Sequence, residues 1–490
     1  MMKRRTFLFT TVSAAGLALV PMRTAFAQSL SAVTLSGEQV MLTAAQLNDF
    51  QRGLKGAVLR PDSTGYDDAR KVWNAEWDRR PALIVRCANV DDVVRTIGFA
   101  REHDLLTAVR GGGHSMSGRS VCDGGIVINL TAINTVEVDP VAKTAVVGGG
   151  ALLGQLDTVA QGHGLVTTAG VVSHTGVGGL TLGGGMGRLM RKFGLTVDNL
   201  LGVELVTADG RIVHANSEEN PDLFWGVRGG GGNFGIVTAF KYQLHNFGGQ
   251  VKTFAYLYPF EKAKDMMEFY VEFSDGADRD AYTNATISRS PRGMTARLSG
   301  AFYGSDAALD RIITKIASLG KPMTERAAVV DYVLLQQRID EQNRYGMHHY
   351  AKAGFTSTRN TDFIDTMLES FIEGPARIAF ASVLPMDGAV SEVASDATAY
   401  PHRDAIFNID SATSWLDPAQ SEAMVVAGRN FWKPVEPFVA NGFYTNSLMD
   451  EGVSAVQANF KGNYTRLVAL KNKYDPTNVF RLNANIAPTV

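Results

Sequence analysis

The chain has 490 residues, of which 45% are hydrophobic and 20% charged, and its 47 basic side chains nearly balance its 49 acidic ones. This length favours two domains with ordinary globular cores. Because no block of like charge occurs, the composition gives no indication of binding to nucleic acid or to an anionic membrane surface, and small molecules are the expected partners.

The first 27 residues have the pattern of an export signal. A basic start with Arg4 and Arg5 precedes an apolar run from Phe7 to Val20 and the sequence AFA at 25–27, which is a small-residue cleavage pattern. The run is shorter than the roughly 20 residues of a membrane-spanning helix, so no membrane anchor is expected after cleavage. The paired arginines are typical of the twin-arginine route for folded proteins, and they predict a periplasmic or secreted protein loaded with its cofactor in the cytoplasm.

From Pro81 the sequence alternates strand-like and helical runs. The strand-like runs are PALIVRCA, LLTAVRGGGH, GGIVINL and NTVEVDPVAKTAVVGGG, and the segment NVDDVVRTIGFAREHD has apolar residues at helical spacing. This alternation is typical of an α+β or α/β cofactor-binding domain, which we place at 28–245.

Glycine is dense in this domain, in four clusters at 111–113, 148–150, 176–187 and in the run RGGGGNFGIV from Arg228. Glycine lets the backbone approach a flat ring or a diphosphate, and neighbouring N–H groups can converge on phosphate oxygens. A single cluster is often only a turn, but four together favour a large dinucleotide. A nicotinamide dinucleotide is less expected, because no GxGxxG motif follows an early strand with an acidic residue about 20 positions on.

His114 directly follows the first glycine cluster, and two interpretations of this stretch are open. It is either a flexible turn with a surface histidine, or a nest of backbone N–H groups around an anionic cofactor with the histidine as ligand or attachment point.

After the glycine clusters, the segment 246–439 has longer helical patterns and strands such as RIAFASVLP, and we interpret it as a second domain inserted into the first. The tail 440–490 predicts a helix that ends near Asp475 and then an extended segment, returning to the first domain. Cys87 and Cys122 form no disulfide framework and have no metal-ligand spacing, so no metal is expected, while a single bridge between them stays open.

Long stretches of the chain resemble flavoprotein oxidases of the berberine bridge enzyme type, within the vanillyl alcohol oxidase superfamily with its PCMH-type FAD-binding domain. The resemblance rests on RPALIVRCANVDDVVRTIGFARE, VRGGGHSMSG, DGGIVINL, GVGGLTLGGGMGRLMRKFGLTVDNL, DLFWGVRGGGGNFGIV, YTNSLMD and KYDPTNVF. It implies an α+β fold, with an FAD-binding domain of two subdomains and an inserted substrate domain of antiparallel sheet covered by helices.

The resemblance implies that His114 bonds covalently to the 8α-methyl group of FAD. Many relatives attach the flavin a second time through a cysteine, but Val172 stands at that place, so a single covalent bond is expected. Leu180 stands where those relatives have a histidine near the flavin pyrimidine ring, which leaves backbone N–H groups to stabilise N1. The other expected FAD-binding residues are Arg110, Gly111, Gly112, Gly113, Ser115, Gly118, Thr175, Gly176, Gly178, Gly179, Gly184, Gly187, Asn199, Gly232, Gly235, Ile236 and Val237.

The implied reaction moves a hydride from a carbon bearing a hydroxyl or amine group to flavin N5, while a base takes the neighbouring proton. Tyr444 and Asn446 match a family segment over the flavin ring, and strand alternation would point both to one face. Tyr444 is the expected base and Tyr464 a weaker candidate, although a tyrosine that only packs at the domain interface is an equally open interpretation. The strand RIAFASVLP contains no carboxylate or lysine, so no charged base is expected on the substrate sheet.

Thr175 matches the position that faces the oxygen-reactive carbon of the flavin, which favours reoxidation by dioxygen. The chain is therefore expected to be an exported flavoprotein oxidase that produces hydrogen peroxide. Two alternatives stay open: a dehydrogenase that passes electrons to a redox partner, and a non-catalytic binding protein with a degenerate flavin fold. The intact glycine clusters argue against the latter. The sequence specifies neither the substrate nor the oligomeric state.

Overall fold

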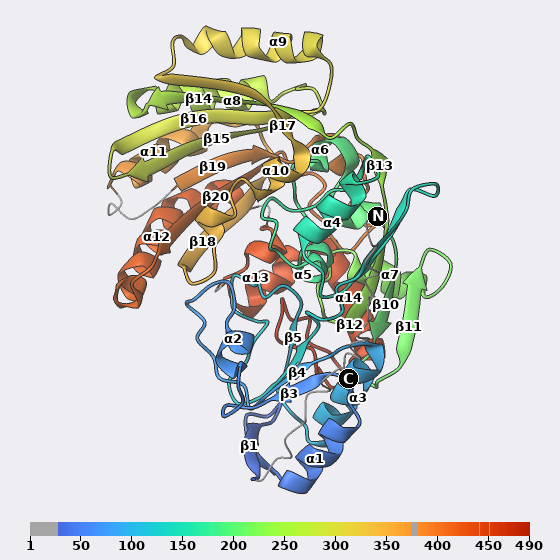
Figure 1. Cartoon of the computed structure of the whole chain (residues 1–490). Helices are drawn as coiled ribbons and strands as arrows, with labels where there is room; N and C mark the ends of the chain where they lie inside the picture. The colour runs from blue at the N-terminus through green and yellow to red at the C-terminus, as the bar shows by residue number, and fades with distance from the viewer. Residues whose placement is uncertain (1–27, 374–379, 441, 450) are drawn as a thin grey trace, which may run out of the picture.

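The structure is a computed structural model that describes residues 28–373, 380–440, 442–449 and 451–490. The expected export signal at 1–27 lies outside the described residues. Figure 1 shows the chain in two parts, with a seven-stranded sheet and its helices above and two smaller sheets below.

The first small sheet has the strand order β3-β4-β6-β5. It is formed by β3 (Ala57–Leu59), β4 (Leu83–Arg86), β5 (Thr107–Arg110) and β6 (Ile126–Asn129), of which the last three are parallel. Strand β6 is buried throughout, as the strands of a parallel sheet covered on both faces usually are. Around the sheet lie α1 (Ala44–Arg52), α2 (Tyr66–Arg70), α3 (Val90–Glu102) and the hairpin of β1 (Leu30–Val33) and β2 (Gln39–Leu42).

The second small sheet is antiparallel, with the order β11-β10-β12-β8-β7. Its strands are β7 (Val136–Asp139), β8 (Thr144–Gly148), β10 (Leu200–Val206), β11 (Ile212–Asn216) and β12 (Ile236–Gln243). The accompanying elements are α4 (Leu153–Gln161), β9 (Leu165–Val166), α5 (Val177–Leu182), α6 (Met190–Phe193), α7 (Pro221–Val227) and β13 (His245–Asn246).

The large sheet is antiparallel throughout, with the order β17-β14-β16-β15-β19-β20-β18. Its strands are β14 (Gln250–Pro259), β15 (Ala281–Ser290), β16 (Gly293–Phe302), β17 (Thr324–Asp331), β18 (His348–Thr356), β19 (Phe380–Pro385) and β20 (Phe407–Trp415). The helices of this part are α8 (Ala263–Phe273), α9 (Asp306–Ile316), α10 (Tyr332–Gln337), α11 (Asp362–Glu373) and α12 (Ser421–Val435).

Strand alternation gives the large sheet two different faces. Phe407 and Ile409 of β20 join the apolar core beneath α8, α11 and α12. Asn408 and Asp410 alternate with them, so they point to the opposite face, where both line a cavity. The helices therefore cover one face of the sheet, and a partly polar face is left toward the rest of the molecule.

The end of the chain packs against the second small sheet. Leu467 and Leu470 of α14 (Tyr464–Tyr474), which follows α13 (Gly452–Asn459), share a core with Leu223 of α7. Lys471 and Asp475 form a fully buried ion pair of 2.6 Å. The same Lys471 ammonium donates to the backbone carbonyl of Asn233, 3.0 Å away in the last glycine-rich loop. The tail thus fixes that loop.

Mixed helices and antiparallel sheets confirm the expected α+β fold. None of the helices in the described part of the chain is long and apolar enough to cross a membrane.

Candidate active site

A cavity of about 590 Å³ lies between the glycine-rich loops and the polar face of the large sheet. This volume is within the range of small-molecule and cofactor sites, about 300–1,000 Å³. The loops at 111–120, 170–187 and 231–237 line one side. Strands β15, β19 and β20 line the other, and the segments 444–448 and 480–484 complete the wall.

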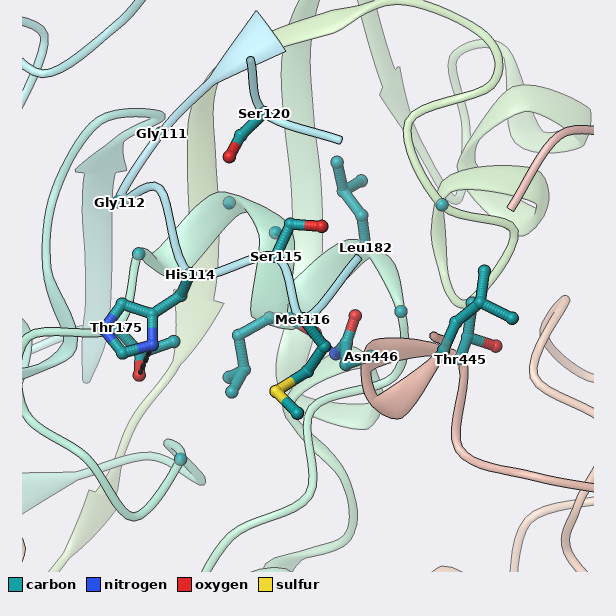
Figure 2. A pocket seen from close by; sticks show the side chains of 18 of the residues that line it. Gly111, Gly112, His114, Ser115, Met116, Ser120, Thr175, Leu182, Thr445 and Asn446 are labelled. Carbon is teal, nitrogen blue, oxygen red and sulfur yellow. Dashed lines mark hydrogen bonds between the residues drawn. The ribbon is translucent and has the colours of Figure 1, made fainter. Parts of the chain in front are cut away.

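Most of the residues expected to bind FAD line this cavity, and Figure 2 shows several of them around it. They are Gly111, Gly112, Gly113, His114, Ser115, Thr175, Gly176, Gly178, Gly179, Gly187, Gly232, Gly235, Ile236 and Val237.

Four expected residues are not among those lining the cavity: Arg110, Gly118, Gly184 and Asn199. The two polar ones donate hydrogen bonds to backbone carbonyl groups nearby. Both glycines have positive φ, and they leave room for the rings of Trp77 and Tyr400 respectively. These four residues shape the loops rather than the cavity surface.

The glycines that line the cavity are of two kinds. A Cβ on Gly112 would lie 2.3 Å from the backbone nitrogen of Gly176, so these two loops need glycine to touch each other. A Cβ on Gly179 or Gly232 would meet no atom within 4 Å, and neither residue has the positive φ that favours glycine. Since the protein itself does not require glycine at these two positions, they fit a bound group that lies against the bare backbone.

Unpaired polar atoms also face this space. Ser120 Oγ, Asn408 Oδ1 and Asn483 Oδ1 are buried without a hydrogen-bond partner, and all three residues line the cavity. A buried polar atom without a partner costs about 1–3 kcal/mol, so such atoms indicate that a ligand or water completes the site.

His114 is held by contacts on several sides. Its ring stacks on Trp73 at a centroid distance of 4.9 Å, and Trp73 stacks in turn on His349 at 4.0 Å. Its Nε2 lies 2.7 Å from Nδ1 of His174, and its Nδ1 lies 3.4 Å from the hydroxyl of Thr175. Burial, together with the neighbouring histidines, lowers the pKa of His114 to about 3, so the imidazole is neutral at physiological pH.

Tyr444 and Asn446 meet at the cavity, although not by strand alternation. The segment Thr445–Ser447 is a 3-10 turn, so the expectation of a strand there is wrong. The Asn446 amide donates to Tyr444 Oη at 2.7 Å, and the backbone N–H groups of Gly185 and Met186 donate to the same oxygen at 3.2 and 3.0 Å. Burial nevertheless raises the pKa of Tyr444, which argues against this side chain as a base.

Tyr464, the weaker candidate for the base, stands at the first position of α14 and packs against the core of the second small sheet. It is not among the residues that line the cavity. The structure thus brings Tyr444 and Asn446 together and leaves Tyr464 apart from them.

Asp410 is a carboxylate that the sequence-based interpretation missed. It lies on β20, and its register partner on β19 is Ser382, whose hydroxyl donates to its carboxylate. Protein encloses the side chain except toward the cavity, and burial raises its pKa from 3.8 to about 6. The expectation of no charged base on the substrate sheet is therefore wrong. The sequence did contain a signal for this residue. In FNIDSATSW apolar and polar residues alternate, which places the one acid on the strand face opposite to the apolar residues.

Formal charge is sparse in the cavity. Among the described residues that line it, Asp410 and Arg119 are the ones with ionised side chains at neutral pH. The neighbours of Asp410 on the same sheet face are neutral, and Asn284, Ser382 and Asn408 are polar. This part of the wall suits a neutral or cationic ligand rich in hydrogen-bond donors.

Known proteins are similar to this chain in both sequence and architecture. Residues 81–216 match the family described as FAD binding domain, and residues 430–487 match the family described as berberine and berberine like. The chain is 32% identical over 445 residues to an FAD-linked oxidoreductase of Dictyostelium discoideum, covering 90% of this chain and 97% of that one. It is 30% identical over 451 residues to (R)-6-hydroxynicotine oxidase of Paenarthrobacter nicotinovorans, covering 89% and 97%.

The chain belongs to the berberine bridge enzyme-like family of FAD-linked oxidoreductases. The solved structure of 6-hydroxy-D-nicotine oxidase from Arthrobacter nicotinovorans superposes with a TM-score of 0.81 at 27% identity, covering 88% of this chain and 98% of that one. Berberine bridge enzyme-like 1 of Physcomitrella patens gives a TM-score of 0.83 at 25% identity, covering 91% and 99%. The resemblance stated from the sequence is confirmed.

This berberine bridge enzyme-like protein is an FAD-dependent oxidoreductase. The bare backbone at Gly179 and Gly232 and the unpaired oxygens of Ser120 and Asn483 fit a flavin dinucleotide in the cavity. The polar face with Asp410 forms the opposite wall of the cavity.

The cysteines of this family member lie away from the flavin site. Cys87 and Cys122 are free and buried, so the bridge between them that the sequence left open is absent. Burial raises the pKa of both thiols to about 12, and neither residue lines the cavity. Val172 does line it, and its side chain has no group that could bond to a flavin.

Proposed function

We propose that the protein is an exported flavoprotein oxidase that oxidises a carbon bearing a hydroxyl or amine group, with FAD held by one covalent bond from His114. The observation that carries the proposal is one cavity in which His114, the bare glycine backbone and the polar sheet face meet. When bound, FAD accepts the hydride and then passes the electrons to dioxygen, giving hydrogen peroxide.

Asp410 is the base in this proposal. With a pKa of about 6, its carboxylate is mostly ionised at neutral pH, and it can take the proton from the substrate hydroxyl or amine group. Tyr444 keeps its proton because its pKa is raised, and its hydroxyl then donates a hydrogen bond that orients the substrate. Asn446 holds the Tyr444 oxygen in place.

The substrate is a neutral or cationic molecule that donates hydrogen bonds. Asp410 and the unpaired Asn408 Oδ1 are acceptors, while Arg119 is the cation among the described lining residues. Similarity to (R)-6-hydroxynicotine oxidase supports oxidation of a small molecule. An anaerobic screen of sugars, alcohols, cyclic amines and anionic hydroxy acids for bleaching of the flavin colour tests this class, and bleaching by the hydroxy acids alone would contradict it.

Dioxygen is the proposed electron acceptor. Thr175 matches the family position that faces the oxygen-reactive carbon of the flavin, and its small side chain, which lines the cavity, leaves dioxygen room to reach that carbon. Stopped-flow mixing of reduced protein with air-saturated buffer distinguishes an oxidase from a dehydrogenase. Reoxidation within seconds, with one hydrogen peroxide per flavin, is expected. Reoxidation that requires an added redox dye would favour the dehydrogenase.

Covalent attachment is tested by acid precipitation and peptide mass mapping. The flavin mass is expected on the peptide that contains His114 and on no cysteine peptide. The variant His114→Ala should release its yellow colour into the acid supernatant, whereas Cys122→Ala should keep it in the pellet. Wild-type protein without an adduct on that peptide would overturn the attachment.

A further inference from the structure

The two ring nitrogens of His114 face different surroundings. Nδ1 lies 3.4 Å from the hydroxyl of Thr175, a residue that lines the cavity. Nε2 lies 2.7 Å from Nδ1 of His174, which is not among the lining residues. One nitrogen is therefore presented toward the cofactor side and the other to a second imidazole behind it.

We propose that His174 is a positioning residue that fixes the tautomer of His114 and accepts its Nε2 proton while the flavin bond forms. This inference rests on the covalent attachment proposed above. It assigns a role to a side chain that touches neither the cavity nor the proposed substrate wall.

The tautomer follows from counting hydrogens. A neutral imidazole carries one N–H, and only one hydrogen can lie between His114 Nε2 and His174 Nδ1. If His114 donates it, His114 Nδ1 carries a lone pair on the side of Thr175, whose hydroxyl lies 3.4 Å away, and this nitrogen can act as a nucleophile once that long hydrogen bond is given up. If His174 donated it, Nδ1 of His114 would carry the hydrogen and could not attack.

The covalent step balances with dioxygen as oxidant. Nδ1 of His114 bonds to the 8α carbon, one C–H bond of that methyl group breaks, and its two electrons stay on the isoalloxazine ring. The methyl group and the imidazole each lose one proton. Dioxygen takes the two electrons and two protons, giving hydrogen peroxide and an oxidised, attached flavin.

A proton acceptor behind His114 is needed because the site is buried. An imidazole alkylated on Nδ1 that kept its Nε2 hydrogen would be a cation, which burial strongly disfavours. His174 Nδ1 is the hydrogen-bond partner that the structure gives to this nitrogen. Transfer of the proton leaves the attached His114 neutral, and His174 then gives the proton up to the reduced dioxygen, so that no charge stays in the site.

The loop that carries His174 is anchored on both sides. The backbone N–H of Ser173 donates to Asp340 at 2.9 Å, and its hydroxyl donates to the same carboxylate. The backbone N–H of Thr175 donates to the carbonyl of Val172 at 3.1 Å. His174 is thus held against His114 by its neighbours rather than by its own second nitrogen, since Nε2 is buried without a partner.

The test compares covalent flavin in purified wild-type, His174→Ala, His174→Gln and His349→Ala proteins. His349 is the matched control, because it is a buried histidine in the same ring stack that does not contact a nitrogen of His114. After acid precipitation, flavin is measured in pellet and supernatant, and the mass of the peptide with His114 is determined. Attachment on adding FAD to flavin-free protein in air is followed over time.

We expect both His174 variants to bind FAD without a covalent bond, with attachment slowed by about 10²-fold, as for the loss of a general base. His349→Ala should be as covalent as wild type. Imidazole added to His174→Ala should restore attachment, because it can occupy the vacated space and take the proton. A merely structural role would show no such rescue.

Each contrary outcome has a separate meaning. Attachment at the wild-type rate in either His174 variant overturns the proposal and leaves the proposed function intact. Equal loss in His349→Ala, or no rescue by imidazole, assigns the effect to packing and also overturns it. Wild-type protein without an adduct would instead refute the covalent attachment itself. If His174→Ala does not fold, the rate of flavin attachment in His174→Gln decides whether the proposal holds. The glutamine side chain keeps the volume of histidine but cannot take a proton.

Discussion

Asp410 and Tyr444 line the same cavity, and burial raises the pKa of both. The consequences are opposite, because the two groups start from different ordinary values. A carboxyl raised from 3.8 to about 6 is still ionised at neutral pH and has become a stronger base. A phenol raised above 10.0 keeps its proton and is a donor.

The Asp410 assignment predicts a pH dependence. Below a pH of about 6 the carboxyl is protonated and cannot accept a proton, so the anaerobic rate of flavin reduction should fall as the pH drops through that value. In Asp410→Asn the rate should be lower by about 10² and this acid limb should disappear. Stopped-flow reduction between pH 5 and pH 8 measures both, and an unchanged acid limb in the variant would place the base elsewhere.

Tyr444→Phe should have a smaller effect. It removes the proposed donor to the substrate, a hydrogen bond of about 1.5 kcal/mol at most, so reduction should slow by roughly tenfold and the acid limb should remain. The three N–H groups that donate to the Tyr444 oxygen lose their acceptor, which should lower the melting temperature of the variant. The same stopped-flow experiment checks it. Slowing by 10² or more, together with a normal rate in Asp410→Asn, would return the role of base to Tyr444 as the sequence predicted.

Among the structural elements, the glycine-rich loops have two structural roles. Some glycines let loops touch, as Gly112 and Gly176 do, and others leave the cavity wall bare, as Gly179 and Gly232 do. The two groups cannot be told apart in the sequence, where all of them are simply glycines in clusters.

Alanine substitution should distinguish the glycines that allow loop contacts from those that leave the cavity wall bare. Gly179→Ala and Gly232→Ala should fold normally, because the added methyl group meets no protein atom, yet they should be purified with much less FAD. Gly98→Ala, on the exposed side of α3 and away from the cavity, is the matched control and should keep its flavin. Melting temperature and the flavin-to-protein ratio are the measurements. Full flavin content in both cavity variants would contradict the proposed location of the cofactor.

Helices α4 and α10 meet through a buried acid. The Gln336 amide donates to Asp157 at 3.3 Å, and burial raises the pKa of Asp157 from 3.8 to about 7. Because the folded state binds this proton more tightly than the unfolded state, the stability it contributes is complete below pH 3.8 and is lost as the pH rises through about 7.

Asp157→Asn should therefore remove part of the pH dependence of stability. At pH 8 the variant should melt above the wild type, by about 1 °C if roughly 1 kcal/mol is recovered in a chain of this length. At pH 4 the two proteins should melt alike, because the wild-type acid is then neutral in the folded state. Thermal unfolding at both values checks the prediction, and parallel curves for the two proteins would contradict it.

At the scale of the whole molecule, the cavity forms only when distant parts of the chain have folded together. Its wall combines loops near residue 114, strands of the large sheet and the tail at 480–484. A protein that binds its cofactor in such a site is expected to be exported folded, which agrees with the twin-arginine pattern at its start.

Replacing both Arg4 and Arg5 with lysine should therefore block export. The precursor should accumulate in the cytoplasm with flavin bound, because folding and flavin binding do not depend on transport. Cell fractionation and flavin fluorescence of the precursor band measure this. Normal export of the double variant would refute the twin-arginine route, and a flavin-free precursor would refute cytoplasmic loading.

The sequence determined the features that local patterns encode. Apolar, strand-like runs predicted the buried strands that begin at residues 83 and 126. The long motif stretches identified the family and the candidate for flavin attachment, His114. The clusters of glycine predicted where the backbone comes close to a cofactor, and most of these glycines line the cavity. These properties depend on neighbours within a few positions along the chain, which is why reading the sequence alone could predict them.

Only the tertiary structure decided which side chains meet. His114 and His174 are 60 positions apart, and Tyr444 accepts from backbone groups more than 250 positions away. Asp410 became a candidate base, and Tyr464 lost that role, because strand pairing and helix packing placed one at the cavity and the other in a core. Such contacts arise from long-range packing of apolar faces, and the pKa values depend on the burial that this packing creates.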